Sequence, residues 1–425
     1  MARLCTCTCN LAGSTLRDTP DLNLFAAAEI PDMNATQDDV NAVDTWLTQM
    51  TVAAAKHGIA KEYGGCFPSM FLHSVTLPTA NQARVGGDYI PGTHRSADAC
   101  SHPNSSSSAD KWLGGNSAQI GRNSLFPWSV GIRPYKDAFL SGFQDWSHTT
   151  CSNPGSGWTK PEWWGLQDAW PATSAAVSAM SAGPIAPCDG VGSSNATLIM
   201  RLARADGVTL KPSRPAFVID STWLLEGFGW PHAAAAVGPE GGELTHTYTE
   251  IAGECWHMAL GFGLRKPYLL SPADLRGCGD GSGPANHLAW QEVNGKWGDT
   301  GPQLPPALVP FGSGLTVPAG DGGASTFWRT APRLCNGSGW TVLGELSKFI
   351  TVSRQRIGSI DSDCAAKTVR LSLLGAPGEQ VELWFVAPGA DGSSPRPEAH
   401  SCTILPAGRT TMALPGGRCA QSYEG

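Results

Sequence analysis

The spacing of apolar residues changes near the middle of the chain, at Pro212–Pro215. Before this point apolar residues recur every three or four positions, and short apolar segments separate these stretches. After it, apolar and polar residues alternate one by one in two segments, residues 367–374 and 379–388. A spacing near 3.6 predicts helices and a spacing of two predicts strands. We therefore expect an α/β domain with a parallel sheet over residues 1–213 and a β-rich domain over residues 214–425.

The clearest predicted helix spans residues 38–57. Its apolar stripe consists of Val40, Val43, Leu47 and Met50, and Gly58 is placed to end it. Two further helices are expected, one from Pro171 to Gly183 and one over residues 194–205. In the second half, residues 367–374 and 379–388 flank a Gly-Ala-Pro-Gly turn and predict a hairpin, and residues 349–352 predict another strand.

Charge and hydropathy exclude two classes of partner. The 425 residues carry a formal net charge of -7, with Lys+Arg 29 and Asp+Glu 36, and no basic stripe of the kind that nucleic-acid-binding proteins use. The chain has no apolar run of the roughly 18 residues that a membrane helix needs. We therefore expect neither a nucleic-acid partner nor a membrane span, and the oligomeric state stays open.

Cysteines and glycosylation signals bear on the compartment. The chain has 13 cysteines and an N-terminus without the apolar core of a secretion signal. Scattered cysteines and Asn-x-Ser/Thr sites favour a secreted protein, although chance also produces such sites. The sites are Asn34, Asn104, Asn195 and Asn336. We expect a secretory or extracellular protein if the N-terminus is incomplete, and a cytoplasmic one otherwise.

Tryptophan is abundant, with 16 residues, five of them between Trp146 and Trp170. Indole rings stack on the apolar faces of sugars while nearby acids and arginines bind the hydroxyl groups. The alternative is that these rings fill the core. The Cys-x-Cys-x-Cys motif over residues 5–9 has no partner cluster at zinc spacing, so we expect no metal and no cofactor.

Acidic residues near predicted strand ends are candidates for catalysis. Asp21, Asp88 and Asp189 occupy such positions, and Arg84 lies close enough in sequence to reach the same pocket as Asp88. Glycoside cleavage needs two carboxyl groups across one bond. The alternative is that these are solvated loop acids.

Several segments, in order, resemble the raffinose synthase and alkaline α-galactosidase group of glycoside hydrolase family 36. The matching segments are Tyr63-Gly-Gly-Cys, Gln82-Ala-Arg-Val-Gly-Gly-Asp-Tyr-Ile-Pro, Ser181-Ala-Gly-Pro-Ile-Ala-Pro-Cys-Asp-Gly, Ala205-Asp-Gly-Val-Thr-Leu-Lys-Pro-Ser-Arg-Pro and Leu269-Leu-Ser-Pro-Ala-Asp-Leu. The resemblance covers residues 20–275. It implies a (β/α)8-type barrel, incomplete at its N-terminal side, followed by an antiparallel β-sandwich.

The resemblance also implies roles for individual residues. Asp21 would be the nucleophile and Asp88 the acid/base of a retaining glycoside hydrolase or galactosyl-transferring enzyme acting on α-galactoside-like oligosaccharides. The substrate-binding residues would be Arg84, Trp112, Glu162, Trp163 and Asp189.

This sequence departs from the family pattern in two places. Pro20 precedes Asp21 where the family has an apolar strand, and only 20 residues precede Asp21, too few for the first barrel units. The competing hypothesis is therefore a catalytically inactive carbohydrate-binding or structural glycoprotein derived from a glycosidase.

Overall fold

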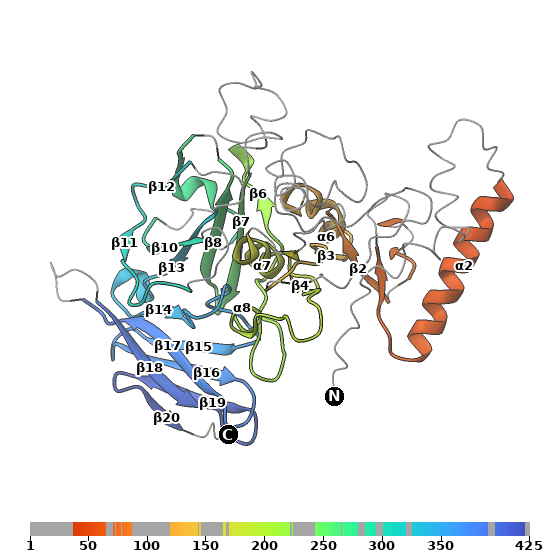
Figure 1. Cartoon of the computed structure of the whole chain (residues 1–425). Helices are drawn as coiled ribbons and strands as arrows, with labels where there is room; N and C mark the ends of the chain where they lie inside the picture. The colour runs from red at the N-terminus through yellow and green to blue at the C-terminus, as the bar shows by residue number, and fades with distance from the viewer. Residues whose placement is uncertain are drawn as a thin grey trace.

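A computed structural model gives the fold of this chain (Figure 1). It describes residues 37–64, 71–72, 74–77, 79–86, 120–142, 144–145, 165–166, 170–221, 223, 243–264, 266–278, 285–294, 301–319, 325–389 and 396–420. In these residues strands are far more numerous than helices. The α-helices are α2 (Gln37–Lys56), α6 (Leu125–Ser129), α7 (Pro171–Met180) and α8 (Ala196–Met200).

Three short strands near the N-terminal end form a parallel sheet. They are β1 (Lys61–Tyr63), β2 (Ala80–Arg84) and β3 (Arg133–Tyr135), in the order β1-β2-β3. A single parallel bridge between Phe139 and Pro187 continues this direction, and β4 (Gln144–Asp145) pairs with β5 (Gly165–Leu166) in an antiparallel ribbon. All carboxyl ends of the parallel strands therefore lie at one edge.

The (β/α)8-type barrel predicted from the sequence is wrong. The described residues form mostly antiparallel sheets with few helices, whereas such a barrel needs eight parallel strands alternating with helices. The barrel was implied by the resemblance to glycoside hydrolase family 36, whereas the alternation of helices and strands by itself predicted a parallel sheet.

The largest sheet has six strands, and its neighbouring strands run antiparallel. Its order is β11 (Val309–Pro310), β10 (Leu288–Asn294), β13 (Ser325–Ala331), β8 (Glu254–Phe262), β7 (Glu243–Ile251) and β6 (Phe217–Val218). A small ribbon of β12 (Leu315–Val317) and β9 (Tyr268–Leu270) shares an apolar cluster with one face of this sheet. The 3-10 turn η3 (Pro272–Asp274) follows β9.

The C-terminal residues form two further antiparallel sheets. One contains β14 (Thr341–Gly344), β17 (Gln380–Val386) and β18 (Pro397–Thr403), and the other contains β15 (Ile357–Asp363), β16 (Thr368–Leu374), β19 (Arg409–Leu414) and β20 (Arg418–Ala420). Alternate residues of both sheets, such as Leu371 and Phe385, are buried in one shared core. Figure 1 shows these strands at the opposite end of the molecule from α2.

The predicted hairpin is right about its two strands and wrong about their pairing. Its strands occur as β16 and β17, and their alternating apolar residues are buried as expected. They do not pair with each other, because β16 pairs with β15 and β19 while β17 pairs with β14 and β18. The turn between them therefore crosses from one sheet to the other.

The strand predicted over residues 349–352 is also wrong. Phe349 and Ile350 are fully buried, but the segment has no strand geometry. Its backbone bonds other groups instead: the N–H of Phe349 donates to the carbonyl of Arg201, and the Phe349 carbonyl accepts from Arg329. Apolarity alone predicted the burial and not the conformation.

The helix predictions fare better. Helix α2 ends at Lys56, two residues before Gly58, which adopts φ +65°. Helix α7 begins at Pro171 as expected. All ten residues of α7 are buried, and its small side chains allow close packing between the parallel strands and the six-stranded sheet. The predicted helix over residues 194–205 is shorter, because α8 ends at Met200.

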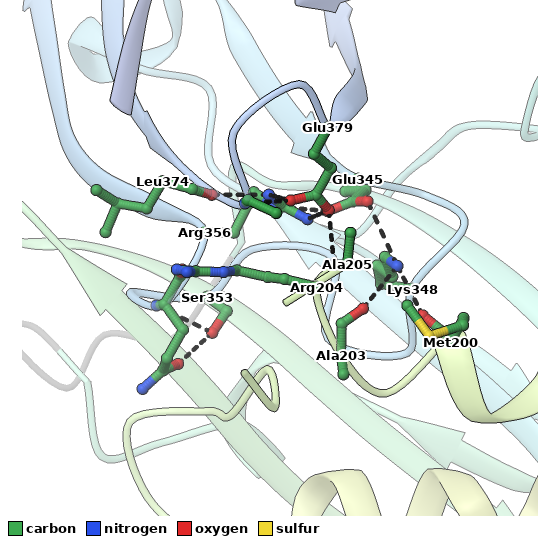
Figure 2. Close-up of polar contacts among 12 residues, drawn as sticks. Met200, Ala203, Arg204, Ala205, Glu345, Lys348, Ser353, Arg356, Leu374 and Glu379 are labelled. Atoms are coloured by element: carbon green, nitrogen blue, oxygen red, sulfur yellow. Dashed lines mark hydrogen bonds and ion pairs between the residues drawn. The ribbon is translucent and has the colours of Figure 1, made fainter. Parts of the chain in front are cut away.

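A polar network fixes the end of α8 to the C-terminal sheets (Figure 2). The Lys348 ammonium donates to the carbonyl oxygens of Met200 and Ala203 at 2.6 and 2.8 Å, which satisfies groups that a helix end leaves unpaired. Glu379 accepts from the backbone N–H of Ala205 at 3.0 Å and from Arg356 at 2.5 Å. The helical and strand-rich parts are therefore joined by charged contacts as well as by apolar packing.

Candidate functional site

Four polar side chains gather at the carboxyl edge of the parallel sheet, and we call them the edge cluster: Glu62, Arg84, Tyr135 and Asp137. Glu62 and Arg84 lie in β1 and β2, Tyr135 is the last residue of β3, and Asp137 follows two positions later. Parallel strands bring residues of different segments to one edge, where ligands of open α/β sheets bind. The edge cluster is therefore the candidate site.

The ion pair of the edge cluster is accessible to solvent. The Arg84 guanidinium lies 3.0 Å from the Asp137 carboxylate, and each side chain is 24% exposed. Arg84 stands opposite Tyr135 in the register of β2 and β3. A guanidinium and a carboxylate held side by side offer donors and acceptors to a ligand with several hydroxyl groups.

Tyr135 links the two outer strands of the sheet. Its hydroxyl donates to Glu62 Oε1 at 2.5 Å, although the two residues lie 73 positions apart. Burial raises the pKa of Tyr135 well above its ordinary value, and the hydrogen bond to Glu62 raises it further. The phenol therefore stays protonated and acts as a fixed donor rather than as a base.

Lys136 lies between the residues of the edge cluster and is buried. Its ammonium donates to the carbonyl oxygens of Asp137 and Ala138, at 3.3 and 2.9 Å. These bonds shape the chain directly after β3. Lys136 thereby positions Asp137.

Asp189 accepts hydrogen bonds from the loop that follows Phe139. Its carboxylate accepts from the N–H of Ser141 at 2.8 Å, from the Ser141 hydroxyl at 2.5 Å and from the N–H of Gly142 at 3.2 Å. The Ser141 hydroxyl in turn accepts from the N–H of Asn195. These bonds tie the segment after Phe139 to the segment before α8, so Asp189 has a positioning role in this geometry.

The other predicted site residues lie outside the described part of the chain. These are Asp21, Asp88, Trp112, Glu162 and Trp163. Of the predicted set, Arg84 and Asp189 are described: Arg84 is the last residue of β2, and Asp189 follows the parallel bridge between Phe139 and Pro187. Asp88 follows Arg84 by four positions in the sequence.

Sequence reasoning missed Glu62, Tyr135 and Asp137. The available signal was the segment Arg133-Pro-Tyr-Lys-Asp, in which an acid lies two positions after a short strand. The prediction instead named Glu162 and Trp163, which lie in the tryptophan-rich segment. The pairing of β3 with β2 is what brings Asp137 to Arg84, and pairing of this range is not visible in the sequence.

A second polar cluster lies on one face of the six-stranded sheet, and we call it the histidine row: His246, His257 and His287. His246 Nε2 lies 3.0 Å from His257 Nδ1, the His257 and His287 rings are 5.5 Å apart between centroids, and His287 bonds Thr330. Arg214 stacks on Tyr248 and approaches His246 Nδ1 at 3.1 Å. The three imidazole rings therefore lie one after another, and Arg214 contacts the first of them, His246.

Burial keeps the histidine row neutral. Desolvation lowers the pKa of His257 to about 3 and that of His287 to about 4, and it holds the pKa of His246 well below its ordinary value. Arg214 lowers the pKa of His246 and His257 further. His246 and His257 are only 2% and 3% exposed, so these two rings do not face solvent and their role is structural.

No cation site emerges from the described residues: no group of three or more His, Cys, Asp or Glu side chains there is arranged to hold a metal ion. Within the same residues, none of the helices combines the length and apolarity required to cross a bilayer. Comparison with protein-family models and with curated proteins finds no match to this chain.

Proposed function

We propose that the chain binds α-galactoside-like oligosaccharides at the edge cluster and acts on them as a retaining glycoside hydrolase or galactosyl-transferring enzyme. The observation that carries the proposal is the Arg84–Asp137 ion pair, whose two charged groups are partly exposed at the carboxyl ends of adjacent parallel strands. Sugar hydroxyls both donate and accept hydrogen bonds, so a fixed donor beside a fixed acceptor suits them.

The chemistry assigns separate roles to the acids. Asp88 would protonate the leaving oxygen and then activate water or an acceptor sugar, and Asp21 would attack the anomeric carbon. Arg84 and Asp137 would hold the hydroxyl groups of the bound sugar, with Tyr135 and Glu62 fixing the strands around them. Since Arg84 precedes Asp88 by four residues, the segment that binds the sugar leads directly to the proposed acid/base.

The decisive experiment compares wild type with Asp88→Asn on a panel of aryl α-glycosides. Loss of the general acid should lower hydrolysis by about 10²–10⁴-fold, while binding of the unreacted sugar persists. Turnover that is unchanged in Asp88→Asn would contradict the assignment of Asp88. An Asp363→Asn variant, altered in the distant strand β15, is the matched control and should retain full turnover.

A second candidate is a catalytically inactive carbohydrate-binding glycoprotein. The fold favours it in one respect, because the closed barrel that would bring Asp21 and Asp88 face to face is not the architecture of the described residues. Sugar binding that depends on Asp137, together with no turnover on any glycoside of the panel, would establish this candidate over the enzyme.

A further inference from the structure

An exposed turn between β13 and β14 carries one of the four glycosylation signals of the sequence. Asn336 lies in the 3-10 turn η4 (Cys335–Gly337), with φ +52° and ψ +36°, and Asn336, Gly337 and Ser338 are all exposed. A side chain built on Gly337 would meet no atom within 4 Å. The turn therefore projects into open space that a bulky group could fill without a clash.

The backbone of the turn is fixed by a disulfide and a hydrogen bond, whereas the Asn336 side chain takes part in neither. A disulfide joins Cys335 to Cys364 at the end of β15, and the Ser338 hydroxyl donates to the Cys335 carbonyl at 2.8 Å. Trp340, which follows, is buried and donates through its indole N–H to the Lys367 carbonyl. The carboxamide of Asn336 makes no hydrogen bond to the described residues, so its modification removes no contact seen there.

Asn195, the other signal within the described residues, differs in this respect. Its side-chain oxygen caps α8 by accepting from the N–H of Leu198 at 3.1 Å, and its backbone N–H donates to Ser141. Its carboxamide is thus part of the fold at the loop that Asp189 organises. The inference is confined to Asn336.

The covalent state of the cysteines fits the compartment in which such modification occurs. The described residues contain three disulfides, Cys255–Cys278, Cys335–Cys364 and Cys402–Cys419. Disulfides form and persist in oxidising compartments such as the lumen of the secretory pathway. Asn-linked oligosaccharides are added to Asn-x-Ser/Thr signals in the same setting.

We propose that Asn336 is an acceptor site for an Asn-linked oligosaccharide. In the transfer, Nδ2 of Asn336 attacks the anomeric carbon of an oligosaccharide carried on a lipid diphosphate. A new C–N bond replaces the C–O bond to the diphosphate, the lipid diphosphate leaves, and Nδ2 gives up one proton. Ser338 completes the signal that the transferase reads, and the glycan extends from the turn into solvent.

The test measures occupancy of Asn336 in the full 425-residue chain, expressed behind a secretion leader in a eukaryotic cell. Enzymatic removal of the glycan in heavy-oxygen water converts an occupied asparagine to a labelled aspartate, which peptide mass spectrometry locates. We expect the label at Asn336 in chains recovered from the medium and from the secretory membranes. Unlabelled Asn336 in both fractions of the wild type would overturn the proposal, whether or not any variant folds.

Two variants at one position sharpen the test. Ser338→Ala should abolish the label at Asn336 while leaving the asparagine in place, and Ser338→Thr should retain it, since threonine also completes the signal. A label at Asn336 that persists in Ser338→Ala would show that the deamidation was spontaneous and would overturn the assignment.

Discussion

The parallel-strand region and the six-stranded sheet both contain an arginine–carboxylate contact, and the two contacts differ in exposure. Arg84 and Asp137 are each 24% exposed in the first region. In the second, Glu292 lies between Arg201 and Arg329, and all three side chains are exposed by 5% or less. The same chemical pair can therefore meet a ligand in one place and serve only to join segments in the other.

The buried network shows what an inaccessible charge requires. Burial raises the pKa of Glu292, and Arg329 and Arg201 more than offset this, so that its pKa lies below the ordinary value. Each arginine also stacks on an aromatic ring, Arg201 on Phe349 and Arg329 on Phe327. The two arginines of the network share one buried carboxylate, whereas the edge cluster leaves its charges partly in water.

The largest effect should come from breaking the buried network. Glu292→Gln leaves Arg201 and Arg329 without a countercharge and should lower the free energy of unfolding by about 3–5 kcal/mol. Urea unfolding measures this. The matched control is Glu398→Gln. The Glu398 side chain is 45% exposed and contacts His400 at 3.2 Å, and the loss there should stay below about 1 kcal/mol. Equal losses of unfolding free energy in the two variants would contradict the conclusion that the buried carboxylate contributes more than the exposed one.

The histidine row should make the six-stranded sheet sensitive to acid. Because the pKa values of His246 and His257 in the folded chain lie below the ordinary 6.5, the unfolded chain binds protons that the folded chain does not. Above pH of about 6.5 the rings are neutral in both states and cost the fold nothing. Below it the free energy of unfolding falls as the pH drops toward the pKa of about 3 that His257 has in the folded chain. At pH 5 the loss should be about 2 kcal/mol for His257, and His246 should add to it in the same direction.

Urea unfolding at pH 7.5 and pH 5 measures this loss. His257→Gln should reduce the dependence on pH. A stability that is flat across this range in the wild type would contradict the neutral, buried state of the row.

The smallest effect on stability is expected at the edge cluster, together with the clearest effect on binding. Asp137→Asn keeps the size of the side chain and should change the free energy of unfolding by less than about 1 kcal/mol, since the ion pair is partly exposed. Binding of an α-galactoside should weaken about tenfold or more, a change of about 1.4 kcal/mol. Calorimetric titration measures the binding, and a variant that binds as the wild type does would remove Asp137 from the site.

Local features of the fold were predictable from the sequence, and long-range pairing was not. The apolar stripe and Gly58 predicted α2, Pro171 predicted the start of α7, and alternation predicted β16 and β17. The partner of each strand depends on contacts far apart in the chain, which is why the hairpin prediction failed. The barrel was implied by the family resemblance, and short motifs in a shared order do not determine how many strands pair or in which direction. The same reason hid Asp137, because its contact with Arg84 spans 53 positions.

Of the candidate site, residue type and place in the sequence identified Arg84 and Asp189. Their functions could not be read in the same way. Asp189 accepts three hydrogen bonds from Ser141 and Gly142, so its carboxylate organises a loop. Only the geometry distinguishes such a positioning acid from one that faces a ligand.

Sugar binding at the edge cluster can be tested with a structure of the protein crystallised with a non-hydrolysable α-galactoside. We predict density for the sugar at the carboxyl edge of β2 and β3, with its hydroxyl groups within hydrogen-bonding distance of Arg84 and Asp137. Sugar bound elsewhere on the molecule, with this edge unliganded at a saturating sugar concentration, would contradict sugar binding at the edge cluster.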